Sequence, residues 1–286
     1  ALYQRWGKED LAIAQFEKLA KLEPDDLGPI VALGEQSWQK GTPDQKKRAQ
    51  QVWQKLATLN KASAYAKLGE VLNEHQNPTE ALANYAKAIK MDDKNPEFYR
   101  GRAQVYEGQK MWGEALADLD KVLLLLDPKA SNKSVRREVR RKYVSIVTRF
   151  SAREQQFKKK WIDGWKDGAG ADPTTTEFGY LLVEYYGKTG KQEKGQPEKT
   201  LEQLHKRVPE DQELVLDLIK YYRFGRRFEP AIVLAQELAA KVQSRQAEMF
   251  HLIADIKMDQ RLDKESREWR EKAIALSPNN ASGYEE

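Results

Sequence analysis

The chain has 286 residues, of which 33% are charged and 40% are hydrophobic, and its formal net charge is +5. It has no cysteine, which excludes disulfides and cysteine-bound zinc. It has no apolar run of about 18 residues, so we predict no membrane span. These properties fit a cytoplasmic or a periplasmic protein equally well and leave the localisation unknown.

Helical signals are clear within the first sixty residues. A small residue four positions before an aromatic, at Ala49 and Trp53, allows one helix to lie close against another. Thr42-Pro43 supplies a cap and a proline at the first helical position ahead of this pair. No segment alternates with period two for long enough to indicate a strand, and apolar residues recur with the period of a helix. The predicted fold class is all-α.

The next segment carries the most informative pattern of the chain. Its motif reads Tyr65-x-x-Leu68-Gly69, followed twelve residues later by Ala81-x-x-x-Tyr85-x-x-Ala88. Residues 62–95 closely resemble the tetratricopeptide repeat family, which places an aromatic and Leu-Gly on one helix and Ala-x-x-x-aromatic on the next. The resemblance implies antiparallel helix pairs that stack into an α-solenoid, with the shape of a right-handed superhelix.

The small residue of the second helix recurs along nearly the whole chain. From Ala81 to Ala115 the step is 34 residues, a period typical of stacked repeats. The recurring positions are Ala12, Ala49, Ala81, Ala115, Thr200, Ala231 and Ser266. We predict about eight repeat-like helix pairs in three parts: regular units over 1–128 with the first truncated, an irregular basic helical unit over 129–173, and divergent units over 174–286.

Both ends of the chain resemble interrupted repeats. In the repeat register Ala1 lies midway along a first helix, and residues 281–284 resemble the opening of a further unit. Natural arrays end in caps with a polar outer face. We therefore expect a fragment of a longer protein, whose missing flanking repeats or domains are among its partners; divergent caps are the alternative.

No pattern of residues indicates catalysis or a cofactor. The three histidines, His75, His205 and His251, fall in three separate units, so we predict no metal site. Phosphate-binding, zinc-protease and serine-hydrolase motifs are absent from the sequence. Pairs of aspartates lie where turns between units are expected. We predict that the chain is not an enzyme and needs no cofactor.

Aromatic residues offer one candidate for partner binding. Most of the seven tryptophans occupy positions that pack helices together. Trp38 lies one position past the second aromatic position of its unit, a rotation of about 100° around the helix. This rotation turns Trp38 toward the groove, where it either lines a binding surface or packs against the core.

Positive charge is concentrated in the irregular unit. Residues 129–160 contain twelve Lys and Arg against two Glu, a net charge of +10 in a chain whose total is +5. Arg136/Arg140 and Arg137/Arg141 are like-charge pairs four residues apart, an arrangement that destabilises a helix slightly. An apolar stripe that includes Val139, Tyr143 and Ile146 occupies the other face. The basic face is either merely solvated or a patch that attracts anions.

The resemblance implies a protein-interaction scaffold that holds a segment of a partner in its groove. Because of the basic unit we expect an acidic partner. The predicted binding residues are Trp38, Arg100, Gln104, Arg136, Arg137, Arg140, Arg141, Lys220 and Arg223. At the positions where some family members clamp a carboxylate only Lys67 fits, so we do not expect that clamp. The alternatives are binding of nucleic acid or another polyanion through residues 129–160, and service as the recognition arm of a larger enzyme.

Overall fold

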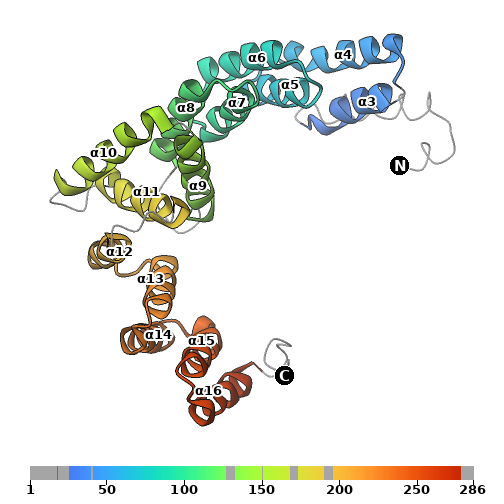
Figure 1. Cartoon of the computed structure of the whole chain (residues 1–286). Helices are drawn as coiled ribbons and strands as arrows, with labels where there is room; N and C mark the ends of the chain where they lie inside the picture. The colour runs from blue at the N-terminus through green and yellow to red at the C-terminus, as the bar shows by residue number, and fades with distance from the viewer. Residues whose placement is uncertain are drawn as a thin grey trace. The chain divides into compact units, whose positions relative to one another are not determined.

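The chain is all α-helical wherever its structure is described, as predicted. The computed structural model describes residue 18 and residues 26–39, 41–126, 133–149, 151–167, 173–189 and 196–277; these contain α-helices, one short 3₁₀ helix and no strand (Figure 1). They fall into two compact units, residues 1–146 and 147–286. The boundary at 146 lies inside a helix. The finer division at 128 and 173 stays a prediction, as does the handedness of the superhelix.

The first unit is an array of antiparallel helix pairs. Its helices are α3 (Gly28–Gln39), α4 (Pro43–Thr58), α5 (Ala62–Glu74), α6 (Pro78–Met91), α7 (Pro96–Gly108), α8 (Trp112–Leu125) and most of α9 (Lys133–Arg149). From α3 to α8 each helix packs against the next in the chain, and α5 also contacts α7 directly (Figure 1). Direct contact between alternate helices is what stacking of successive pairs requires.

The second unit is also a series of α-helices. Its helices are α10 (Ser151–Asp167), α11 (Pro173–Thr189), α12 (Gln196–Arg207), α13 (Gln212–Phe224), α14 (Phe228–Lys241), the 3₁₀ helix η2 (Gln243–Arg245), α15 (Gln246–Asp259) and α16 (Asp263–Leu276). Each α-helix of this unit packs against its successor. In the described residues of the two units, no helix is both long and apolar enough to cross a membrane.

Helix contacts confirm the predicted register. The six small residues that the structure describes are all buried: Ala49, Ala81, Ala115, Thr200, Ala231 and Ser266. A methyl group added to Gly69 would lie 3.1 Å from the backbone oxygen of Ala81, so α5 and α6 touch there. The aromatic four residues after Ala81, Tyr85, belongs to a core with Trp53 and Leu68. Ala12 lies outside the described residues.

The turn inside four of the helix pairs has one recurring geometry. Gln76, Lys110, Arg226 and Arg261 have φ between 56° and 62°, in the left-handed region. In each turn the next amide donates to the carbonyl oxygen five residues earlier, as from Asn77 to Leu72 at 2.8 Å. This is the Schellman motif, which satisfies the carbonyl groups that the end of a helix leaves free. The repeat therefore extends to the backbone of the turns.

The helix start predicted at Thr42 is confirmed, and Asn77 begins α6 in the same way. Thr42 and Asn77 accept hydrogen bonds from the backbone amides of Gln45 and Glu80, at 3.3 and 3.4 Å, and a proline follows each cap. These caps fix where α4 and α6 begin and so hold the second helix of each pair in place.

Candidate functional site

The groove candidates of the first unit lie on α7. Gln104 is exposed and Arg100 is half-buried. Arg100 forms an ion pair with Glu97 at 3.2 Å, between side chains that are both more than a third exposed. Water competes strongly with an exposed pair of this kind, so Glu97 holds Arg100 only weakly.

The candidates of the second unit differ from each other. Lys220 is exposed on α13. Arg223, one turn later, donates to Asp259 of α15 and lies 3.8 Å from Asp255. The hydrogen bond from Arg223 lowers the pKa of Asp259 below its ordinary value of 3.8. Arg223 therefore links α13 to α15. Its charge is less accessible than that of Lys220, which is exposed.

Two of the four arginines predicted for the basic surface are buried. Arg136 is 5% exposed and Arg140 is 8% exposed, so neither belongs to a solvated face. Arg136 donates to the backbone oxygens of Leu123, at 2.9 Å, and Leu126, and thus caps the end of α8. Reversing the charge of either residue would bury a carboxylate in place of the guanidinium, so we expect it to destabilise the fold. Both members of the like-charge pair Arg136/Arg140 therefore lie inside the fold, whereas Arg137 and Arg141 do not.

The other two arginines remain within reach of a partner. Arg141 is exposed and Arg137 is half-buried on α9. Lys142, the neighbour of Arg141, forms an ion pair of 2.6 Å with Glu107 of α7. This contact places α9 beside the helix that carries Arg100 and Gln104. We call Arg100, Gln104, Arg137 and Arg141 the α7–α9 surface.

Trp38 packs within an aromatic cluster that the α3–α4 pair forms with the end of α5. Its ring lies 5.6 Å from that of Trp53 and 4.4 Å from that of His75, and Lys46 lies over its outer face at 5.2 Å. The side chain is partly buried against the core of the unit. Core packing thus accounts for much of its surface, and its role in partner binding stays a prediction.

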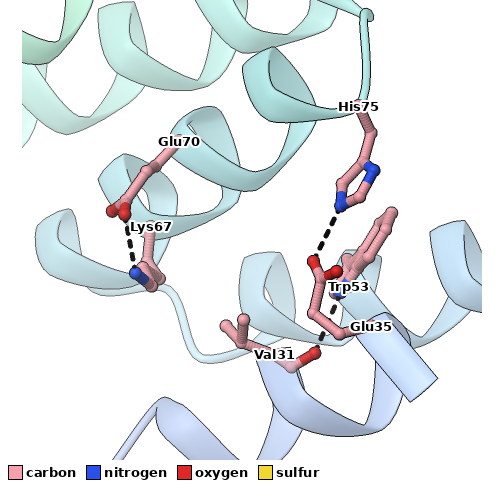
Figure 2. A network of polar contacts seen from close by, with 6 residues as sticks. All are labelled: Val31, Glu35, Trp53, Lys67, Glu70 and His75. Carbon is pink, nitrogen blue, oxygen red and sulfur yellow. Dashed lines mark hydrogen bonds and ion pairs between the residues drawn. The ribbon is translucent and has the colours of Figure 1, made fainter. Parts of the chain in front are cut away.

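The same cluster contains a polar contact that the sequence reasoning missed. His75 Nε2 lies 2.7 Å from Glu35 Oε1 across two consecutive helix pairs (Figure 2). The spacing of the three histidines gives no sign of this contact, because its other member is a carboxylate 40 residues earlier in the chain. The repeat register could have indicated this contact. It places the end of the first helix of one pair near the end of the first helix of the following pair.

A second missed interaction is structural. Asp118 is buried in α8 and accepts two hydrogen bonds from Arg102 of α7, at 2.8 and 2.7 Å. Such a paired arrangement satisfies both charges and fixes the angle between the two helices. Nothing in the residue types alone distinguishes this pair from solvated surface charges.

The comparisons with known proteins give one family match. The tetratricopeptide repeat family matches residues 62–95. No curated protein has a sequence that matches this chain. Among solved structures, the type IV pilus biogenesis factor PilW is 18% identical, with 77% of this chain and 94% of that chain covered and a TM-score of 0.43.

Two further structures have similar figures. The type III secretion translocator chaperone SycD of Yersinia enterocolitica is 22% identical over 43% of this chain and 84% of its own, with a TM-score of 0.35. A tetratricopeptide repeat protein from Parabacteroides merdae is 14% identical over 96% of both chains, with a TM-score of 0.37. The family match coincides with the motif and with the α5–α6 pair, whose small residues are buried as the repeat requires. The chain therefore carries a tetratricopeptide repeat, at residues 62–95.

Proposed function

We propose that the chain is a protein-interaction scaffold that binds an acidic segment of a partner on the α7–α9 surface. Stacked helix pairs form extended surfaces that hold partner segments, and the tetratricopeptide repeat is a unit of this type. No chemical step is assigned to the chain, and the proposal concerns binding alone.

One observation carries the proposal: the Glu107–Lys142 ion pair joins α7 to α9 inside the first unit. It connects the helix of the groove candidates with the helix of the accessible cations, which supports the proposal. Exposed Arg141 and half-buried Arg100 and Arg137 supply positive charge, and Gln104 supplies amide groups for hydrogen bonds to a peptide backbone. Cations at the rim of a binding surface speed the approach of an acidic partner more than they tighten the final complex.

A defined probe tests the proposal. A fluorescein-labelled glutamate-rich peptide is titrated with the whole chain, and fluorescence anisotropy gives the affinity and the association rate. The double variant Arg100→Glu/Arg141→Glu should bind more weakly, mainly through slower association, because both changed side chains reach solvent. Arg136 and Arg140 are left unchanged because they are buried.

The matched control is Lys47→Glu/Lys90→Glu. It alters the net charge by the same amount at exposed positions of α4 and α6, the second helices of their pairs. It should bind the peptide nearly as the parent chain does. Equal weakening by the two double variants would show an effect of net charge only and would refute the proposed surface.

The polyanion alternative is an outcome of the same titration. A single-stranded DNA oligomer replaces the peptide, and the salt concentration is varied. Phosphate contacts release counterions, so affinity for DNA falls steeply as salt rises. Tighter binding of DNA than of the peptide at physiological salt would favour the polyanion reading over the protein scaffold.

A further inference from the structure

Three metal-binding groups converge in the first unit. They are the carboxylates of Glu35 on α3 and Glu74 at the end of α5, and the imidazole of His75 immediately after it. One ligand atom from each lies within 4.8 Å of the other two, and Nε2 of His75 lies 2.7 Å from Oε1 of Glu35. The groups come from two consecutive helix pairs, so only the folded array assembles them.

Packing holds the imidazole in position. The ring of His75 stacks on Trp53 with centroids 4.5 Å apart and an angle of 18° between the planes, and Trp38 lies against it at 4.4 Å. Trp53 is fully buried and donates from Nε1 to the backbone oxygen of Val31 at 3.3 Å. The two indoles thus fix the plane of the imidazole. Nε2 of His75 points toward the carboxylate of Glu35 (Figure 2).

The cluster is closed on one side and open on the other. The His75 side chain is 13% exposed and the Glu35 side chain is 31% exposed, while Glu74 is exposed. The aromatic rings exclude water from one side of the imidazole, and the carboxylates border the solvent. The carboxylates are therefore accessible to an ion from solution.

The hydrogen bond between His75 and Glu35 does not account for the second carboxylate of the cluster, that of Glu74. The contact between His75 and Glu35 needs no third group, yet Glu74 brings another negative charge to the same place. Two carboxylates at this separation repel each other, and a bound cation removes the repulsion. Two carboxylate oxygens and one imidazole nitrogen also form a ligand set that zinc accepts.

We propose that Glu35, Glu74 and His75 bind a divalent transition cation of the zinc class. Zinc bonds to nitrogen and oxygen ligands measure about 2.0–2.2 Å, which puts tetrahedral ligand atoms ~3.3 Å apart. To reach this geometry Nε2 of His75 and Oε1 of Glu35 separate from 2.7 Å, and the Glu74 oxygen, which lies within 4.8 Å of both, adjusts by rotation of its exposed side chain. The imidazole ligand favours zinc over magnesium and calcium, which prefer oxygen. Three protein ligands leave a fourth position for water.

Calorimetry of the whole chain with zinc chloride tests the site. We expect one zinc ion per chain, a change in tryptophan fluorescence that saturates at the same ratio, and a higher thermal unfolding temperature in zinc. Glu74→Gln should weaken zinc binding by at least about tenfold, since even changes in the outer shell of a metal site cost 10–100-fold. Glu74 is exposed, so this variant should fold as the parent chain does. Its melting temperature in chelator checks that it does.

The controls separate this site from adventitious binding. Glu70→Gln removes a neighbouring carboxylate of α5 that pairs with Lys67 and lies outside the cluster (Figure 2). His251→Gln removes an imidazole of the second unit. Both should bind zinc as the parent chain does, and His75→Gln should not. The proposal is overturned if the parent chain binds no zinc, if Glu74→Gln and His75→Gln bind it unchanged, or if magnesium binds equally well.

Discussion

At the residue scale, Arg136 shows how a sequence pattern can mislead. Its charge is part of the most basic segment of the chain, but its guanidinium lies inside the fold and holds the end of α8. Residues on one basic helix face can therefore have different structural roles, and composition does not distinguish these roles. Burial, which depends on how α8 packs against α9, separates them.

The role of Arg136 makes a quantitative prediction. Arg136→Met should lower the free energy of unfolding by roughly 1.5–3 kcal/mol, the usual contribution of hydrogen bonds that involve a charged group. Arg141→Met, at an exposed position of the same helix, should change it by no more than about 0.5 kcal/mol. Urea unfolding measures both variants. Equal losses of stability would contradict the capping role.

The ion pair between Arg223 and Asp259 predicts a dependence on pH. The pKa of Asp259 is lowered in the folded chain, mainly by the hydrogen bond from Arg223, so the pair contributes stability above the ordinary pKa of 3.8. That contribution is lost as the pH falls through the lowered pKa. The difference in unfolding free energy between the parent chain and Asp259→Asn should therefore be constant near neutral pH and shrink in acid.

Glu237→Gln, at an exposed position of α14, serves as the control for this measurement. The result to look for is the difference in unfolding free energy between the parent chain and Asp259→Asn. If this difference stays the same below the ordinary pKa of aspartate, the ion pair contributes nothing to the pH dependence.

At the element scale, the small residues of the second helices determine how closely each pair can pack. Ala81 is fully buried against α5, whereas Ala83 is exposed on the same helix. Ala81→Leu should overpack the pair and cost about 1–3 kcal/mol, and Ala83→Leu should be nearly neutral. Thermal unfolding compares the two. Equal stabilities would mean that the register of the repeat is wrong.

This register was predictable because it depends on residue size. Ala49, Ala81 and Ala115 must be small wherever two helices touch, and their spacing is visible in the sequence. The turns were not predictable in the same way. Glycine is the usual signal of a left-handed helix end, but Gln76, Lys110 and Arg261 adopt that conformation here, with the cost met by the hydrogen bonds of the turn.

The candidate sites also differ in how far the sequence predicts them. Exposed Gln104 and Arg141 lie where helix periodicity indicates, because the surface position of a helical residue follows from its spacing. The convergence of Glu35 and His75 could not be predicted from the sequence. The two residues are 40 positions apart and meet only because their helix pairs pack together. Long-range contacts of polar residues leave little trace in a single sequence, whereas apolar periodicity leaves a strong one.

At the scale of the whole molecule, the chain comprises two compact units built from the same kind of helix pair. In an array of stacked repeats, stability is approximately a sum of local terms between neighbours. A partner segment can therefore bind one region of the first unit and leave the second unit unchanged. The proposed function places that region on α7 and α9.

Hydrogen–deuterium exchange of the whole chain, with and without a saturating amount of the glutamate-rich peptide, tests this claim most directly. Bound peptide should slow amide exchange in α7 and α9, because a ligand that binds only the folded chain suppresses local opening where it makes contact. Exchange in α4 and in the helices of the second unit should stay as it is in the free chain. Protection confined to α4 and α6, or to the second unit, would contradict the proposed binding surface.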